Sequence, residues 1–492
     1  MSRYGRCTRR NSEEVDISDS GSLGNKGYYA YCLATIYGEQ DEEDIDYDLH
    51  EKNREFWNRW AYSCLSPASM NRLIENGSLA RSEIRPFSDD EIEMVLKAFR
   101  LRCKDVEAEL PTKIESCYFS KFHFEKPVCF RGFRFLWTTG FEGSRFASKA
   151  EFTDSKFCAV SSFKDALFED FVDFGSSIFY KSAHFSKSVF EYGARFTLSR
   201  FSDFAWFSKC RFNSGSLYIK KCIFQGELDL SQVVVVGDIN LEGSEFQKSL
   251  QINHGQINKN VALDGAVLEQ DLTLENCVVS AKASFSKMSV LGNASFLNTE
   301  FGGSTSFFEA TFQGRPPNFA GSILHEDTDW RSVSWPSSPA TADEASHYVR
   351  AYERLKLEMD RLKRGEDELF FLSLELRCKA KRDGGERAAL IWIYWVLSNF
   401  GQSFWRPITA LIMVWVVGLA SLFSCALTLP QAMAISSSNL VAFFGFSRAY
   451  ISAELLQALP WWTKLLFAGQ TVVSAVLLFL LLLALRNRFR IK

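Results

Sequence analysis

The chain has 492 residues, of which 47% are hydrophobic, 15% aromatic and 23% charged, and its formal net charge at pH 7 is −3. This length corresponds to roughly two to four folding units, and the near-neutral charge argues against a dedicated nucleic-acid binder, which normally carries a strong basic excess. With 29 Gly and 11 Pro the composition excludes collagen-like and Pro-rich disordered material, and the aromatic residues are weighted to Phe, with 45 Phe against 15 Tyr and 12 Trp.

The first part of the chain divides into a polar segment and a helical region. Residues 1–27 are polar, rich in Gly and Ser, and lack the apolar stretch of a signal peptide, so we expect them to be disordered. Ser88 and Glu91 form a capping-box pattern before a stretch with helical spacing of apolar residues. The sequence predicts a helical N-terminal cap over 28–112. Its acidic run, 41–51, is interpreted as a solvated loop or first helical turn, with cation or basic-partner binding as the alternative.

From Phe119 onward, apolar residues recur at alternating gaps of five and six residues. The first 18 positions of this ladder, Phe119 to Phe212, are all Phe. After a step of seven residues the ladder continues with Ile, Leu, Val and Phe to Phe312, and a second such step leads on toward Trp335. The underlying period is 11 residues. The predicted solenoid core includes Phe119, Phe124, Phe130, Phe152, Phe174, Phe196, Leu241, Leu263, Phe285 and Phe307.

The spacing favours short strands over helices. A small or apolar residue often stands two positions before a ladder residue, as at Ala166, Ala183 and Ala205. Residues i−2 and i share one face of an extended strand, so each segment turns a small and a large side chain inward. A helix would scatter the Phe side chains, because steps of five and six residues rotate by about 500° and 600°. The pattern therefore predicts short strands that alternate with bends and wind into a solenoid.

Stretches such as FTDSKF (152–157) and FEATFQG (308–314) resemble the Phe-rich branch of the pentapeptide-repeat family. The resemblance covers 119–335 and implies an all-β solenoid, a right-handed quadrilateral β-helix, over 113–336. Every second unit has one residue more than a strict five-residue repeat and two units have two more, and we expect the corners to absorb these residues. At about 22 residues per coil, the solenoid would contain about ten coils.

Beyond Pro336 the apolar spacing becomes helical. Tyr348 lies on the apolar face of a predicted helix that ends at Gly365, and a second helix ends near Arg382. Residues 337–387 are therefore predicted to form a helical hairpin linker. We favour packing of this hairpin against the solenoid over an oligomerisation stalk.

The C-terminal part contains apolar segments of different lengths. The segment 388–400 has about ten consecutive apolar residues, too few to cross a bilayer, and its aromatic content predicts an interfacial helix. The segment 408–429 carries 22 uncharged residues, and a further apolar segment covers 465–485. Each is long enough for one crossing. Residues 405–492 are thus predicted to form a two-helix transmembrane region, a helical transmembrane hairpin.

Cationic residues flank this predicted pair of spans. They are Lys379, Lys381, Arg382, Arg387 and Arg406 before it and Arg486, Arg488, Arg490 and Lys492 after it, whereas the loop 430–464 contains Arg448 and Lys464 alone. The positive-inside rule then predicts a multi-pass protein of the cell inner membrane. The N-terminal and C-terminal ends and the solenoid would be cytoplasmic.

A few polar and small residues within the spans are candidate pore or packing residues. They are Gln470, Thr471 and Ser474 in the second span and Gly418 and Ser421 in the first. The region resembles the two-helix C-terminal part of many bacterial membrane-bound pentapeptide-repeat proteins, which is sometimes likened to the pore module of ion channels. Its loop contains no TVGYG-type filter. We interpret these residues as pore-lining groups or as helix-packing residues and favour packing.

The sequence contains no pattern typical of an enzyme or a metal site. The six His are scattered, HExxH, GxSxG, P-loop and GxGxxG contexts are absent, and the 12 Cys form no CxxC pair. We therefore predict a non-enzyme without catalytic residues, cofactor or metal, and with reduced structural thiols. Residues 119–335 contain 22 Lys and Arg against 24 Asp and Glu, too balanced for the DNA mimicry known from some soluble pentapeptide-repeat proteins.

These patterns lead to a membrane-anchored pentapeptide-repeat protein that presents a cytoplasmic β-helix as an interaction or scaffold surface. Its expected partners are the lipid bilayer and an unknown cytoplasmic protein, a homo-oligomer is left open, and nucleic acid is not expected. The alternative is an oligomeric membrane pore or membrane-perturbing effector gated by the solenoid, since a single span would suffice for anchoring. A passive stability or envelope-organising factor is a third option.

Overall fold

The computed structural model describes residues 23–41, 44–111, 117–423, 428–440 and 460–489. The chain divides into two units, the first formed by 1–314 with 321–334 and the second by 315–320 with 335–492, and each is described by itself. Most of the segment predicted to be disordered, 1–27, lies outside the described residues. Its last residues belong to a helix that begins at Leu23.

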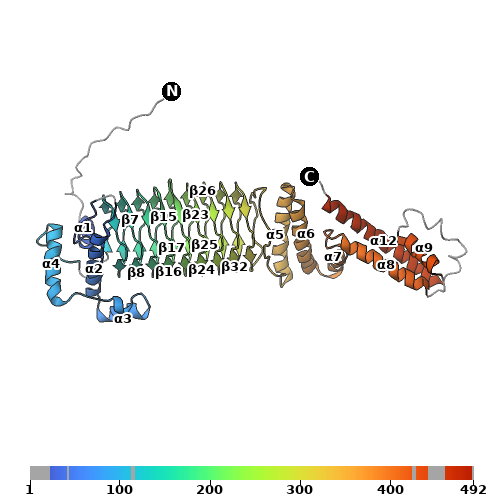
Figure 1. The fold of residues 1–492 in the computed structure, drawn as a ribbon, viewed down its shortest axis with the longest axis horizontal. Helices are drawn as coiled ribbons and strands as arrows, with labels where there is room; N and C mark the ends of the chain where they lie inside the picture. Colours follow the sequence, from blue (N-terminus) through green and yellow to red (C-terminus); the bar gives the residue numbers. More distant parts are fainter. Residues whose placement is uncertain (1–22, 42–43, 112–116, 424–427, 441–459, 490–492) are drawn as a thin grey trace, which may run out of the picture. The chain divides into compact units, whose positions relative to one another are not determined.

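The N-terminal part of the first unit is helical (Figure 1). Its helices are α1 (Leu23–Ala34), α2 (Tyr47–Ser63), α3 (Pro67–Glu75), the 3₁₀ helix η2 (Arg81–Glu83) and α4 (Asp89–Cys103). The carboxylate of Asp46, in the acidic run, caps α2 by accepting hydrogen bonds from two backbone N–H groups. The capping box of Ser88 and Glu91 at the start of α4 is confirmed.

The repeat folds into a parallel β-solenoid of about nine turns with four faces (Figure 1). Each face is a sheet of nine very short strands, and the strands that pair are one turn, mostly 22 residues, apart, as for Leu167 and Val189. The first sheet runs from β1 (Cys117–Tyr118) to β33 (Ala294–Ser295), and the second from β2 (His123–Phe124) to β34 (Glu300–Phe301). The third sheet runs from β3 (Val128–Cys129) to β35 (Thr305–Ser306), and the fourth from β4 (Arg134–Phe135) to β36 (Thr311–Phe312). Beyond β36, isolated parallel bridges at Ile323, Asp329 and Ser334 begin a further turn.

The ladder side chains fill the interior of the solenoid. The ten predicted core residues are all buried, with exposed fractions of 3% or less. Rings at equivalent positions of successive turns stack in parallel, as for Phe174 and Phe196, whose centroids are 4.9 Å apart. Rings on opposite faces meet edge to face, as for Phe163 of the first face and Phe174 of the third at 5.1 Å. Each ring therefore packs against aromatic neighbours both along and across the solenoid.

A column of small polar side chains ties successive turns together. These residues occupy the i−2 position on the second and fourth sheets, where a small or apolar residue was expected. The Ser177 hydroxyl donates a hydrogen bond to the Phe152 carbonyl oxygen at 2.6 Å, and the Cys222 thiol donates to the Phe196 oxygen at 2.7 Å. Burial raises the pKa of Cys222 to about 12, so the thiol stays protonated and serves as a donor. A buried hydroxyl or thiol needs an acceptor, and the preceding turn supplies it.

Extra residues of the repeat are absorbed at corners, as predicted. The seven-residue step from Phe212 to Ile219 passes through Gly215, which lies against the preceding turn. A Cβ atom at Gly215 would be 2.1 Å from both the carbonyl carbon and the carbonyl oxygen of Tyr192. The carbonyl oxygen of Gly215 accepts a hydrogen bond from the N–H of Gly237 in the next turn at 3.1 Å. Only a residue without a side chain fits at this corner.

The second unit begins with the helical hairpin of α5 (Ala342–Arg361) and α6 (Gly365–Asp383). The predicted end of the first helix at Gly365 is wrong, because Gly365 begins α6 and the left-handed turn residue is Lys363, with φ of 58°. Buried Glu375 joins the two helices by accepting a hydrogen bond from Lys356 of α5 at 2.7 Å. It also forms an ion pair with Lys379 of its own helix at 2.5 Å. The packing of this hairpin against the solenoid stays a prediction.

Four further helices follow in the described part of the second unit. They are α7 (Gly385–Ser398), α8 (Trp405–Phe423), α9 (Leu429–Leu440) and α12 (Trp461–Arg488). Among the described residues, α8 and α12 are long and apolar enough to cross a membrane. In the most apolar stretch of each, 17% and 28% of the residues are buried, whereas the core helix of a soluble protein would be mostly buried. The two helices therefore suggest membrane association.

Candidate functional site

The helices α8 and α12 run antiparallel, and α9 packs on both of them (Figure 1). The Asn487 side chain near the end of α12 donates a hydrogen bond to the Gly401 carbonyl oxygen, just before α8, at 3.2 Å. At the other end, Leu422 of α8, Ile435 of α9 and Phe467 of α12 belong to one buried apolar cluster. The helix α9 therefore runs back along α8 from the end that lies away from Gly401.

Gln470 lies at the centre of a buried polar cluster formed by these three helices. Its Nε2 donates a hydrogen bond to the Ser436 Oγ at 3.0 Å, and its Oε1 accepts one from the Asn439 Nδ2 at 3.2 Å. The Ser436 hydroxyl in turn donates to the Trp415 carbonyl oxygen of α8 at 2.9 Å. An unpaired polar group in apolar surroundings costs several kcal/mol, so these bonds specify how α9 packs on the two longer helices.

Gly418 makes the close approach of Gln470 possible. A Cβ atom at Gly418 would lie 2.6 Å from the Gln470 Nε2 and 2.7 Å from the Ser436 Oγ. The amide of Gln470 therefore occupies the space that a side chain on α8 would fill. Small residues that allow such approaches are typical of helix interfaces in membranes.

Of the five predicted pore or packing residues, the structure brings Gln470 and Gly418 together. Ser474, one turn further along α12, is fully buried, and its Oγ has no hydrogen-bond partner among the described residues. Thr471 is half-buried beside Gln470. Ser421 is half-buried as well, and its hydroxyl donates to the Gly418 carbonyl oxygen of its own helix at 2.8 Å.

Sequence reasoning missed the two residues of α9 that complete the cluster, Ser436 and Asn439. The signal that indicates them is the polar run SSSN, 436–439, within a segment otherwise rich in apolar residues. The cluster consists of neutral amides and hydroxyls. Such groups can form hydrogen bonds between helices, or they can bind water or a cation. Among the residues that the structure describes, no three His, Cys, Asp or Glu side chains are grouped to hold a metal ion.

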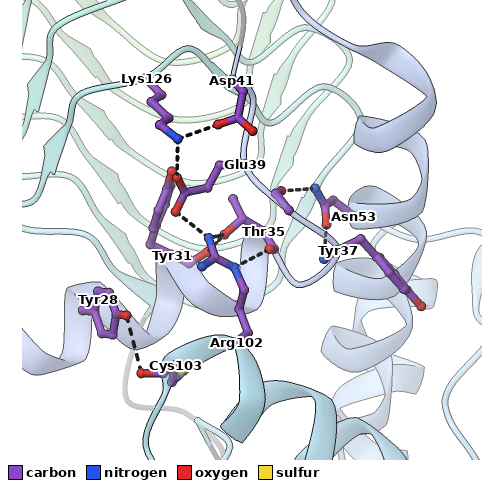
Figure 2. Close-up of polar contacts among 11 residues, drawn as sticks. Tyr28, Tyr31, Thr35, Tyr37, Glu39, Asp41, Asn53, Arg102, Cys103 and Lys126 are labelled. Carbon is purple, nitrogen blue, oxygen red and sulfur yellow. Dashed lines mark hydrogen bonds and ion pairs between the residues drawn. The ribbon is translucent and has the colours of Figure 1, made fainter.

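A second polar region lies where the N-terminal helices meet the first turn of the solenoid (Figure 2). Arg102 of α4 donates to the Thr35 carbonyl oxygen at 2.8 Å and to the Glu39 carboxylate at 2.5 Å. Glu39 also pairs with Lys126 of the solenoid at 3.0 Å. Burial alone would raise the pKa of Glu39, but the bonds from Arg102 and Lys126 hold it below its ordinary value. The pairs of this region therefore join α4 to the first turn.

The helix α2 covers the open backbone edge of the first turn, as predicted for the N-terminal cap. The Trp57 Nε1 donates to the Arg134 carbonyl oxygen at 3.1 Å. The Asn58 side chain bonds both the Gly132 carbonyl oxygen at 3.1 Å and the Arg134 N–H at 2.8 Å. Uncovered strand edges invite pairing with other chains. These side chains therefore end the solenoid and block its extension.

We expect His50 of α2 to make this cap sensitive to pH. It lines a small pocket with Asn53 and donates from Nε2 to the Arg131 carbonyl oxygen at 2.9 Å. Burial lowers the pKa of His50; Arg54 lowers it further, while Glu151 opposes the shift. As the pH falls, His50 therefore binds a proton at a higher pH in the unfolded chain than in the folded protein. The contribution of neutral His50 to stability is complete above about pH 6.5 and is lost as the pH falls through the folded pKa.

We expect the N-terminal cap of the full-length protein to be cleaved faster by a protease at pH 5.5 than at pH 7.5. In His50→Gln, which keeps a side-chain donor but does not titrate, this acceleration should shrink. His123→Gln, a substitution at an exposed histidine of the first turn, is the control and should behave as wild type. An unchanged pH effect in His50→Gln would contradict the assignment to His50.

Comparisons of the chain with models of known protein families, with curated proteins and with solved structures found no match. The class of the protein is therefore defined by its fold and its candidate site. The protein is a repeat protein with a parallel β-solenoid of about nine turns and a period of about 22 residues, preceded by helices. It also carries two helices long and apolar enough to span a membrane.

Proposed function

We propose that the protein is a membrane-anchored pentapeptide-repeat protein whose β-solenoid serves as a cytoplasmic scaffold for a protein partner. The observation that carries this function is the exposed apolar surface of the antiparallel pair α8 and α12. Phe479 and Leu482 on α12 are 64% and 65% exposed, an arrangement that suits lipid and is costly in water. In this function the protein acts by binding, without catalysis, cofactor or nucleic acid.

The repeat geometry supports membership in the pentapeptide-repeat family. The solenoid has four sheets, a large apolar residue at each ladder position, and often a small or apolar residue two positions earlier on the same inward side. Ala183 and Phe185 are one such pair, and both are fully buried. This inward pair is the feature that the resemblance implies for the family.

Charge distribution supports a location in the cell inner membrane with cytoplasmic ends. Because α8 and α12 are antiparallel, Arg406 at the start of α8 and Arg486 and Arg488 at the end of α12 share one end of the pair. Lys464 lies at the other end of α12. Basic residues favour the cytoplasmic side of a span, so this asymmetry supports a cytoplasmic N-terminus and C-terminus.

The test is membrane partition of the full-length protein after an alkaline wash. We expect wild type in the membrane pellet, and trypsin should digest the solenoid in inverted vesicles and spare it in right-side-out vesicles. The double variant Phe479→Asp, Leu482→Asp should leave the pellet, because two carboxylates within the apolar length of a span oppose its insertion. Leu101→Asp at an exposed site on α4 is the control. Wild type in the soluble fraction would overturn the anchor.

A second candidate function is an oligomeric pore gated by the solenoid, and one observation favours it. The helix α9 runs back along the two candidate spans and places Ser436 and Asn439 against Gln470, well inside their apolar length. A hydrophobic hairpin would anchor the protein without such a polar helix. Neutral oxygens at this depth are the kind of group that replaces the hydration of an ion.

Ion flux into liposomes that contain the full-length protein separates the two functions. If the protein acts as an anchored scaffold, wild-type protein should give no flux above empty liposomes. If it forms a pore, wild-type flux should fall to background in Gln470→Leu while insertion is unchanged. Val472→Ala, at a 64% exposed position of the same helix, is the matched control and should keep the wild-type flux.

A further inference from the structure

Three arginines of the second unit lie over aromatic rings at one end of the candidate spans. The Arg377 guanidinium carbon of α6 is 5.9 Å from the Trp395 ring centroid, and that of Arg406 in α8 is 5.8 Å from the same centroid. Arg488 of α12 lies 4.8 Å over Phe404. Three helices thus place cations beside the last turn of α7 and the short segment that joins α7 to α8. We call these residues the arginine cluster (Arg377, Arg406 and Arg488).

The fold holds these side chains in place. The Arg406 Nη1 donates to the Trp395 carbonyl oxygen at 2.8 Å, which fixes its guanidinium beside the ring. The bond from Asn487 to the Gly401 oxygen places the end of α12 against the same segment. Stacking on a ring leaves the in-plane N–H donors of a guanidinium available for an anion.

The arginine cluster has no carboxylate partner among the described residues. On α6, Glu375 pairs with Lys356 and Lys379, and Asp383 pairs with Arg382. Arg377 and Arg406 lie beside the same ring, so this region carries positive charge that no ion pair among the described residues neutralises. The arginine cluster can therefore take up an anion. A phosphate suits it, because a phosphate can accept two N–H hydrogen bonds from one arginine.

The neighbouring surface indicates where such a phosphate would come from. On α7, Leu390, Trp392 and Ile393 are exposed, at 67%, 60% and 45%. This apolar face beside the cationic cluster, at the ends of both candidate spans, combines the features of a lipid interface. We propose that the arginine cluster binds the phosphate of an anionic phospholipid headgroup, an inference that rests on the proposed membrane anchor.

The test is binding of phosphatidylglycerol to the purified full-length protein in detergent, measured by native mass spectrometry. At roughly fivefold per cation, Arg377→Gln with Arg406→Gln should weaken binding about 25-fold. Arg406→Lys should give an intermediate loss, since it keeps the charge without the planar group. Lys381→Gln with Arg387→Gln removes the same charge from exposed positions on the adjoining helices and should change binding less than about twofold.

Two further arms make the result decisive. Equal binding of phosphatidylglycerol by wild type and the Arg377→Gln, Arg406→Gln variant would overturn the inference. Inorganic phosphate that displaces the lipid from wild type at millimolar concentration would also overturn it, since the site would then serve a soluble anion. Circular dichroism checks that the variants fold. Wild type that washes off membranes refutes the anchor itself, whereas wild type that stays membrane-bound without these arginine effects refutes the lipid site alone.

Discussion

Replacing Phe174 by Ala should lower the free energy of unfolding of the solenoid by about 3–5 kcal/mol. The Phe174 ring is fully buried, stacked 4.7 Å from Phe152 and 4.9 Å from Phe196, and it meets Phe163 and Phe185 edge to face. Truncation would leave a cavity that these four rings cannot fill, because β-hydrogen bonds hold the turns that carry them at a fixed separation. Urea unfolding of the full-length protein, followed by circular dichroism, measures the loss.

The matched control is Phe174→Leu at the same position. Leu241 and Leu263 occupy the same column of the third sheet, so the interior accepts this side chain with ordinary packing. We expect a loss of about 1–2 kcal/mol, well below that of the Ala variant. Equal losses for Leu and Ala would contradict a core in which ring packing matters.

Gly215→Ala should destabilise the solenoid by at least about 2–3 kcal/mol, although it adds a single methyl group. The added carbon would lie 2.1 Å from two backbone atoms of Tyr192 and 2.3 Å from the Gly193 nitrogen. Backbone atoms cannot move aside as a flexible side chain does, so the turns must separate. The change in urea midpoint of the full-length protein again measures the effect.

Gly255→Ala is the control for this prediction. Gly255 occupies an i−2 position, and a Cβ atom there would meet its nearest neighbour at an ordinary 3.4 Å. Ala166 fills the equivalent site in an earlier turn. We expect Gly255→Ala to change stability by less than about 1 kcal/mol, with the reduced freedom of the unfolded chain in its favour. A large loss at Gly255 would show that the clash at Gly215 is not the cause.

The solenoid was predictable because the residue pattern that specifies it is local and repeated. An 11-residue period of Phe defines which side chains face inward, and the parallel sheets follow once successive turns stack. The chemistry of the i−2 column was less accessible. Ser177 and Cys222 read as small core residues in the sequence, and only the neighbouring turn, 22 residues away, reveals that their side chains donate to backbone oxygens.

The candidate site between the apolar helices was predictable in part for the opposite reason. Gln470 stands out because a polar amide in an apolar run needs an explanation. Its partners Ser436 and Asn439 could not be assigned, since they lie on another helix and no period fixes the register between α9 and α12. The end of α5 was misplaced for a local reason, because Lys363 adopts the left-handed conformation that glycine was expected to supply.

The equivalence of the turns has a consequence for how such a protein can change its length. Most turns meet their neighbours through stacked apolar side chains and pair with a spacing of 22 residues, so a duplication or deletion of 22 codons would add or remove one complete layer. The N-terminal helices would keep their contacts with the first turn, and each event would alter the span of the displayed surface by about 4.8 Å. Recombination between the repeats of the gene can thus change the length of the solenoid in fixed increments while the terminal parts of the chain remain intact.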